Sequence, residues 1–246
     1  METKARQEKP PKLYDLTSLQ RDANRLLGYT AQQTLDYAQA LYEKSLISYH
    51  RTDSRYLTSH MADSTRTLVM TAAQASPFPC PCIPTPCHIQ QVIDDSHVSD
   101  HHAIIPTASI GGSDMTLLPA GERSILTLLM VRLLCAIGDV CRANETTVML
   151  ECGGQSFSAK GRQVTDKGWK AIEQAYLNTL KNAPAADAPV QELPPLNEQM
   201  TFLPISAYVK EGKTTPPKSH TEATLLSSME TAGAEDMPDD AERKGL

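Results

Sequence analysis

The chain has 246 residues, of which 40% are hydrophobic and 5% aromatic, and its 23 Lys and Arg against 29 Asp and Glu give a net charge of −6. This length allows one or two domains with a hydrophobic core, and the mixed composition excludes collagen, coiled-coil and fully disordered proteins. The longest apolar run, Ile125 to Ile137, contains Arg132 and is shorter than the roughly 20 residues of a membrane span, so we expect no membrane partner.

The distribution of charge predicts where a polyanion could bind. Residues 1–60 carry nine Lys and Arg against seven Asp and Glu, whereas residues 181–246 carry six against eleven. A site for nucleic acid should therefore be local and lie in the N-terminal third. Six cysteines do not amount to a disulfide framework, and the polar residues after Met1 do not form a secretory signal, so we expect a cytoplasmic protein.

The first 45 residues predict an extended start followed by two helices. Residues 1–12 are polar and end in two prolines, which favour extended backbone. A first helix capped by Thr17 or Ser18 should end at Gly28. Thr30 opens the second helix with a capping box, and its apolar stripe continues through Leu41 and Tyr42.

The remaining chain predicts mixed structure. Hydrophobic periodicity indicates helices over 59–73, 119–137 and within 166–180, and a further helix from Thr221 through Met229. Strands are indicated over 46–54 and 200–210, and a hairpin should pair 146–150 with 156–160 around Gly153-Gly154. Proline-rich composition indicates a loop over 76–87 and a linker over 183–195.

One polar segment combines residues that could act on a phosphodiester: Tyr49-His50-Arg51-Thr52-Asp53-Ser54. A tyrosine hydroxyl has a pKa near 10, so its attack on phosphorus requires a nearby base or cation. In an extended segment Tyr49 and Arg51 would face the same side, and the guanidinium could hold two phosphate oxygens. From chemistry alone, a tyrosine at a strand end beside a surface arginine and a capping aspartate is the better explanation, because tyrosine is common in strands.

The same segment resembles the active-site run Tyr-x-Arg-Thr-Asp-Ser of type IA DNA topoisomerases. Further segments are similar to blocks of that family, in family order, over about residues 9–246, and two of them are closest to the topoisomerase III branch. These segments are Lys9 to Gln20, Ala31 to Leu35, Asp100-His101-His102-Ala103-Ile104-Ile105-Pro106-Thr107, Lys213 to Lys218, and Thr221 to Leu226.

The resemblance implies a reaction on single-stranded DNA. Tyr49 would attack the backbone and form a 5′-phosphotyrosine link, Arg51 would stabilise the phosphate, and His101 would join the phosphate network. No nucleotide cofactor would be needed. Residues implied to contact DNA are His102, Thr52, Asp53, Ser54, Lys218, Thr221 and Glu222. Rejoining the cut strand after another strand has passed would permit relaxation and decatenation.

The sequence departs from the family at its metal site. A complete enzyme carries a toprim domain whose Glu and Asp-x-Asp motif hold Mg²⁺, and no Asp-x-Asp occurs in this sequence. We therefore expect a gate-region fragment that lacks the toprim domain, with no metal bound to this chain. Metal would act chiefly in rejoining the strand, so this chain alone should have little or no topoisomerase activity.

The resemblance also implies an α+β fold in three parts. Residues 13–142 would form a mostly helical gate domain bearing Tyr49. Residues 1–12 and 143–212 would form a β-rich arch that acts as a mobile hinge. Residues 213–246 would be the start of a helical DNA-binding domain, truncated relative to the family.

Two other functions stay open on the sequence. One is a noncatalytic gate module that binds single-stranded DNA without cleaving it. The other is a zinc protein, because Cys80, Cys82, Cys87 and His88 offer three thiols and an imidazole. Their spacing is not that of a standard zinc knuckle, and a surface loop is the simpler explanation.

Overall fold

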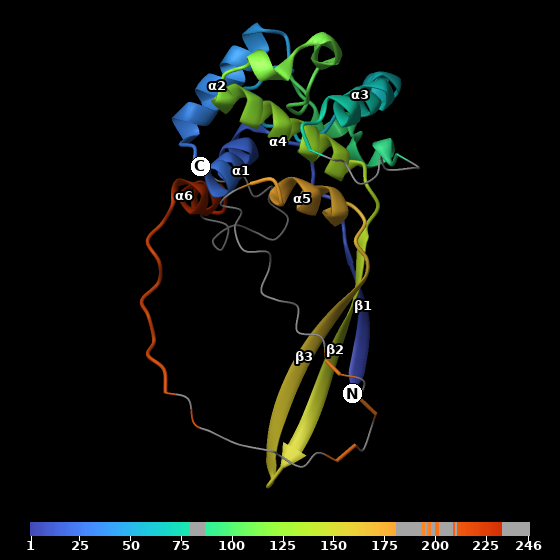
Figure 1. The fold of residues 1–246 in the computed structure, drawn as a ribbon, viewed down its shortest axis with the longest axis vertical. Coiled ribbons are helices and arrows are strands. Elements are labelled where there is room, and N and C mark those ends of the chain that lie inside the picture. Colours follow the sequence, from blue (N-terminus) through green and yellow to red (C-terminus); the bar gives the residue numbers. More distant parts are fainter. Residues whose placement is uncertain are drawn as a thin grey trace.

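The computed structural model describes residues 1–78, 87–180, 193–194, 196–197, 200–201, 209 and 211–232. These residues form a helical body from which a long three-stranded sheet extends as an arm (Figure 1). The chain is thus a mixed protein of helices and antiparallel strands. The predicted linker over 183–195 and strand over 200–210 fall largely outside the described residues, as does the acidic end from Gly233.

Helices α1 (Leu16–Leu27) and α2 (Ala31–Glu43) form where the sequence predicts them. The cap of α1 is Asp15, whose carboxylate accepts a hydrogen bond from the Ser18 amide at 2.7 Å. The prediction of Thr17 or Ser18 as the cap is wrong, because Ser18 is the third helical residue of a capping box. Gly28 ends α1 with a φ of 72°, and Thr30 caps α2 as predicted.

Helix α4 (Ala120–Ala136) is the centre of the helical body. Its apolar residues are buried around its whole circumference, since α2, α3 (Ala62–Ala75) and α5 (Lys170–Leu177) all pack against it. A 3₁₀ turn, Ser59–Met61, precedes α3. Within the described part of the chain, no helix combines the length and apolar character needed to cross a membrane.

The predicted strand over 46–54 does not form. Ile47 makes a single antiparallel bridge with Pro106, and the backbone after it is irregular. Its partner segment, residues 87–118, is also irregular and contains short 3₁₀ turns at Ile89–Val92, Asp95–His97, Ala108–Gly112 and Met115–Leu117. These two segments pair through side-chain hydroxyls together with a few backbone hydrogen bonds, such as that from the Ser48 amide to the Ile105 carbonyl, and periodicity does not reveal this pairing.

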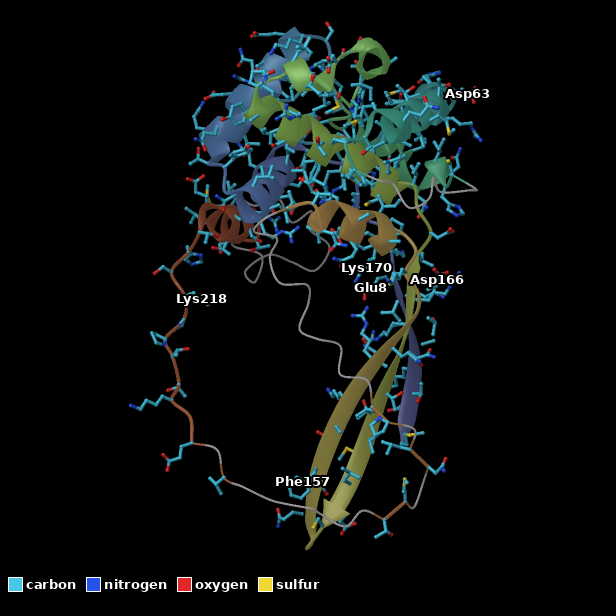
Figure 2. The ribbon with its side chains drawn as sticks, in the orientation of Figure 1. Glu8, Asp63, Phe157, Asp166, Lys170 and Lys218 are labelled. Carbon is cyan, nitrogen blue, oxygen red and sulfur yellow. The ribbon has the colours of Figure 1, made fainter. Side chains whose placement is uncertain are left out.

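The arm consists of β1 (Glu2–Glu8), β2 (Cys141–Cys152) and β3 (Gln155–Asp166), in that order and antiparallel. β2 and β3 form the predicted hairpin, although they are longer than predicted. Gly153 and Gly154 turn it with φ values of 56° and 74°, the positive values that a two-residue hairpin turn requires. Phe157 near the far end of the arm is exposed (Figure 2).

The base of the arm is tied to α5 (Figure 2). The carboxylate of Glu8 on β1 pairs with Arg162 of β3 and with Lys170 of α5, and its backbone carbonyl accepts a hydrogen bond from the Trp169 indole at 3.2 Å. The other face of α5 buries Ile172 and Tyr176 in the helical core. Helix α5 thus lies between arm and body.

Helix α6 (Glu222–Glu230) forms as predicted and packs against α1. Arg21 of α1 pairs with Glu230 at 2.6 Å, and the Asn24 side chain accepts a hydrogen bond from the Ala223 amide at 3.2 Å. This contact brings the start of the third predicted part onto the helical body. The proposed domain boundaries themselves stay a prediction.

A buried polar triad joins α1, α4 and the segment before α1. The Tyr14 hydroxyl donates to Asp22 at 2.7 Å, and Arg132 donates to that hydroxyl at 2.8 Å and pairs with Asp22. Burial alone would raise the pKa of Asp22, but Arg132 and Arg25 outweigh it and lower the pKa. The stabilisation from this carboxylate is therefore present at neutral pH and is lost as pH falls through the lowered pKa.

Arg132→Met should lower the free energy of unfolding by about 3–5 kcal/mol, because it leaves the mostly buried Asp22 carboxylate with only the half-exposed Arg25 as a cation. The double variant Arg132→Met/Asp22→Leu should recover most of this loss, since it removes both charges. Urea denaturation followed by circular dichroism measures both changes.

Arg142→Met is the matched control. Its partner Asp166 lies 3.5 Å away and both side chains are about half exposed, so the variant should change stability by less than about 0.5 kcal/mol. If the Arg132 and Arg142 variants lost equal free energy of unfolding, the buried triad would contribute no more to stability than an exposed ion pair does.

Candidate active site

The segment that carries Tyr49 is held against residues 101–106 by Ser48. The Ser48 amide donates to the Ile105 carbonyl at 2.9 Å, and its hydroxyl accepts from the Ile105 amide at 2.9 Å and donates to the Ala103 carbonyl at 3.1 Å. One serine therefore links two stretches that lie more than fifty residues apart in the sequence.

Thr52 and Ser54 continue this connection. The Thr52 hydroxyl donates to the His101 carbonyl at 3.1 Å and accepts from the Ser54 amide at 3.1 Å, while the Ser54 hydroxyl donates to the His97 carbonyl at 2.7 Å. Both residues are buried, whereas Asp53 between them is exposed. The two hydroxyls predicted to contact DNA thus have partners inside the protein.

These hydrogen bonds bring together two of the predicted catalytic residues. The rings of Tyr49 and His101 lie 4.2 Å apart between centroids, with an angle of 40° between their planes. Tyr42 from the last turn of α2 meets Tyr49 edge-on at 5.5 Å, and His50 lies 5.5 Å from Tyr49. We call these four residues the aromatic cluster.

His50 is the member that sequence reasoning passed over. Its ring is buried, and neither ring nitrogen has a hydrogen-bond partner among the described residues. Burial lowers the pKa of His50 and the nearby charge of Arg51 lowers it further, so the imidazole is neutral at pH 7. A neutral ring is the form that burial favours at this position.

Arg51 is exposed and Tyr49 is half-buried. Among the described residues, neither the Tyr49 hydroxyl nor the Arg51 guanidinium has a hydrogen-bond partner, so both polar groups are free to meet a ligand. The argument that alternation in a strand places both on one side does not apply, because the backbone after Ile47 is irregular. Their joint action on one phosphate stays a prediction.

His102 faces a different environment from His101. Its Nδ1 lies 2.8 Å from the Ala103 carbonyl, so this nitrogen is the donor and Nε2 is left as an acceptor. The ring lines a cavity of about 210 Å³ between α3 and the 105–108 stretch, together with Ser48 and Thr65.

The predicted DNA contacts near the C-terminus lie elsewhere on the body. The Glu222 carboxylate accepts a hydrogen bond from the Ala31 amide at 2.6 Å, at the first turn of α2, and Thr221 caps α6. Because Tyr42 is in the last turn of α2, roughly 17 Å of helix separates these residues from the aromatic cluster. Lys218 is exposed on the extended segment leading to α6 (Figure 2).

Within the described residues, no three His, Cys, Asp or Glu side chains converge on a point that could hold a metal ion. His88, a candidate zinc ligand, bonds instead to Asp139 at 2.8 Å. Cys80 and Cys82 lie outside the described residues, so the zinc hypothesis stays untested there.

Comparison with known proteins finds one matching family model and several similar proteins. Residues 1–234 match the family model described as DNA topoisomerase. DNA topoisomerase 3 of Bacillus subtilis is 34% identical over 236 residues, covering 91% of this chain and 31% of that protein, and DNA topoisomerase 3 of Bacillus cereus is 35% identical over 225 residues, covering 89% and 30%. The chain therefore spans about 30% of the length of these relatives.

The fold also matches a solved structure. Full-length topoisomerase I from Thermotoga maritima has a TM-score of 0.56 with this chain at 20% identity, over 93% of this chain and 36% of the other. At that identity the likeness concerns the fold.

Thr52→Val should lower the free energy of unfolding by about 1–3 kcal/mol, because it removes the donor to the His101 carbonyl and leaves the buried Ser54 amide without an acceptor. Thermal unfolding measures the change. Thr58→Val is the control, since Thr58 makes no side-chain capping bond and should change stability by less than about 0.5 kcal/mol. Equal effects would contradict a special role for Thr52.

Proposed function

Because this chain belongs to the type IA DNA topoisomerase family, in its topoisomerase III branch, we propose that it carries the DNA-cleaving tyrosine of such an enzyme. The supporting observation is the contact between the rings of Tyr49 and His101, which joins two motif segments about fifty residues apart. The proposed nucleophile is Tyr49, and the proposed substrate is single-stranded DNA.

In the proposed reaction the Tyr49 oxygen attacks a backbone phosphorus. The new bond is a 5′-phosphotyrosine ester, the bond from phosphorus to the 3′ oxygen breaks, and the 3′ hydroxyl leaves with the proton that Tyr49 gives up. The number of phosphate ester bonds is unchanged, so the reaction needs no nucleotide cofactor. The reverse attack by the 3′ hydroxyl reseals the strand.

Arg51 and His101 have complementary roles in this proposal. The Arg51 guanidinium is exposed and unpaired among the described residues, so it can hold two phosphate oxygens and balance the charge that grows in the transition state. His101 is exposed beside Tyr49 and can donate a hydrogen bond to the same phosphate. Both groups act on the phosphate that Tyr49 attacks.

The other site residues fall into those that hold the Tyr49 segment in place and those that would contact DNA. We propose that Thr52 and Ser54 act mainly by holding the Tyr49 segment in place, because their hydroxyls have partners within the protein. Asp53 and His102 remain candidates for contact with DNA near the cleavage point. Lys218, Thr221 and Glu222 would contact a more distant part of the strand, about one α2 length away.

The family implies Mg²⁺, and the described residues of this chain do not fit it, since no three potential ligands converge. We therefore assign Mg²⁺ to the complete enzyme, whose toprim domain would supply the ligands, and route no step of cleavage through it here. The remainder of such an enzyme, toprim domain and rest of the helical DNA-binding domain, is the expected protein partner.

Strand passage requires the break to open. We propose that the β1–β3 arm acts as the hinge, because the contacts of Glu8 to Lys170 and Trp169 attach it to the body at its base. Movement there would separate the helical body from the DNA end that it does not hold covalently.

A trapping assay tests the nucleophile. The chain is mixed with single-stranded DNA labelled at its 3′ end, which the 5′-phosphotyrosine link keeps on the protein. Denaturing gel electrophoresis of the mixture should then reveal a labelled protein band. Tyr49→Phe should abolish this band, because the variant lacks the attacking oxygen. Tyr42→Phe is the matched control and should retain it, since it removes the neighbouring hydroxyl only.

The outcomes separate the two function classes. A covalent adduct that survives in Tyr49→Phe would refute the assignment of the nucleophile. Binding of DNA with no adduct in the unaltered chain would favour the noncatalytic, single-stranded-DNA-binding gate module.

The chain by itself should not relax supercoiled DNA measurably, because rejoining and strand passage draw on groups that its described residues do not supply. Agarose gel electrophoresis of negatively supercoiled plasmid, with and without Mg²⁺, checks this. Relaxation at catalytic amounts of the chain would contradict the proposed division of the active site.

A further inference from the structure

Tyr42 differs from what its sequence position predicts. The apolar stripe of α2 includes Ala38 and Leu41, which are fully buried, and the stripe extended to Tyr42 predicts that this ring is buried as well. In the structure 43% of Tyr42 is exposed. A large aromatic side chain thus reaches solvent in the last turn of α2, beside the proposed nucleophile.

The aromatic cluster combines exposed and buried rings. The Tyr49 ring, itself half-buried, lies 5.5 Å from that of Tyr42 and 4.2 Å from that of His101, and both of these neighbours are exposed. His50 lies near both tyrosines but is buried. Tyr42 and His101 are therefore the members of the cluster that are most accessible to a ligand.

Exposed aromatic rings are a typical binding surface for single-stranded nucleic acid. Proteins that hold single strands stack successive bases on exposed aromatic rings, and this contact tolerates any base because every base has a flat face. The exposed guanidinium of Arg51, two residues after Tyr49, supplies positive charge in the same segment. The Tyr42 ring also offers its surface from a helix, a rigid element that does not depend on the irregular Tyr49 segment.

We propose that Tyr42 is a base-stacking residue, which holds one base of single-stranded DNA next to the phosphate that Tyr49 attacks. This proposal rests on the proposed function in that the ligand is single-stranded DNA. Stacking on Tyr42 would fix the neighbouring nucleotide and so limit the positions that the phosphate can adopt. Its contribution would be nearly independent of base identity.

The test measures dissociation constants by fluorescence anisotropy with oligonucleotides that carry one abasic site at successive positions. All proteins carry Tyr49→Phe, so that no covalent product contributes. With intact DNA, adding Tyr42→Leu should raise Kd about five- to 150-fold, the range expected for one stacked base, whereas adding Tyr42→Phe should change Kd less than about twofold.

The abasic series separates stacking from support of Tyr49. One abasic position should weaken binding to the protein with Tyr42 and leave binding to the Tyr42→Leu protein unchanged, because both changes remove the same contact. If Tyr42→Leu raised Kd by the same factor for intact DNA and for abasic DNA at every position, the proposal would be overturned. A Tyr42→Phe protein that binds as weakly as the Tyr42→Leu protein would also overturn it. Circular dichroism spectra that match would confirm that α2 is intact.

The outcomes also distinguish the two proposals. Suppose that Tyr42→Leu weakens binding only where the DNA carries a base, and that the trapping assay yields no adduct at Tyr49. This result would support the stacking role of Tyr42 and refute the cleavage function. A Tyr49 adduct without the abasic effect would do the reverse. Absence of binding to every oligonucleotide would overturn both.

Discussion

The proposed active site depends on one set of hydroxyl contacts. Ser48, Thr52 and Ser54 hydrogen-bond to the backbone of residues 97–105, and they place the ring of Tyr49 against that of His101. A regular sheet does not form here, since among the described residues the two segments share one bridge, at Ile47, and a few backbone hydrogen bonds beside it. Short polar side chains are suited to the task because they satisfy buried backbone groups where a strand ladder is interrupted.

This dependence changes how the active-site motif should be interpreted. A run such as Thr52-Asp53-Ser54 near a catalytic tyrosine suggests direct contact with the substrate, yet the buried hydroxyls serve the protein and the exposed Asp53 does not share their partners. Under the proposed function, the polar residues of one motif therefore divide between holding the Tyr49 segment and contacting DNA. Substituting the first kind should affect stability, and substituting the second kind should affect binding.

Local signals predicted most helices and the hairpin. The capping box at Thr30, the apolar period of α4 and the glycine pair at 153–154 each fix structure within a few residues. The prediction of a strand over 46–54 was wrong because the partner segment is distant in the sequence and pairs partly through side-chain hydroxyls. The contact between Tyr49 and His101 could be anticipated only from the order of family motifs, since spacing along the chain does not place residues fifty apart together.

The burial of individual side chains in the aromatic cluster was the property least predictable from the sequence. It decides which of these side chains a ligand can contact. Periodicity on α2 assigns Tyr42 to the core, but the residue lies in the last turn of the helix and its ring reaches solvent. His50 shows the opposite case, an ionisable residue in a polar motif that the fold buries. With the His50 imidazole buried and neutral, the rings of Tyr42 and His101 and the guanidinium of Arg51 are the exposed groups that a DNA strand can meet. The combination favours a polyanion whose bases are unpaired, because a duplex would keep its base faces stacked and out of reach of these rings.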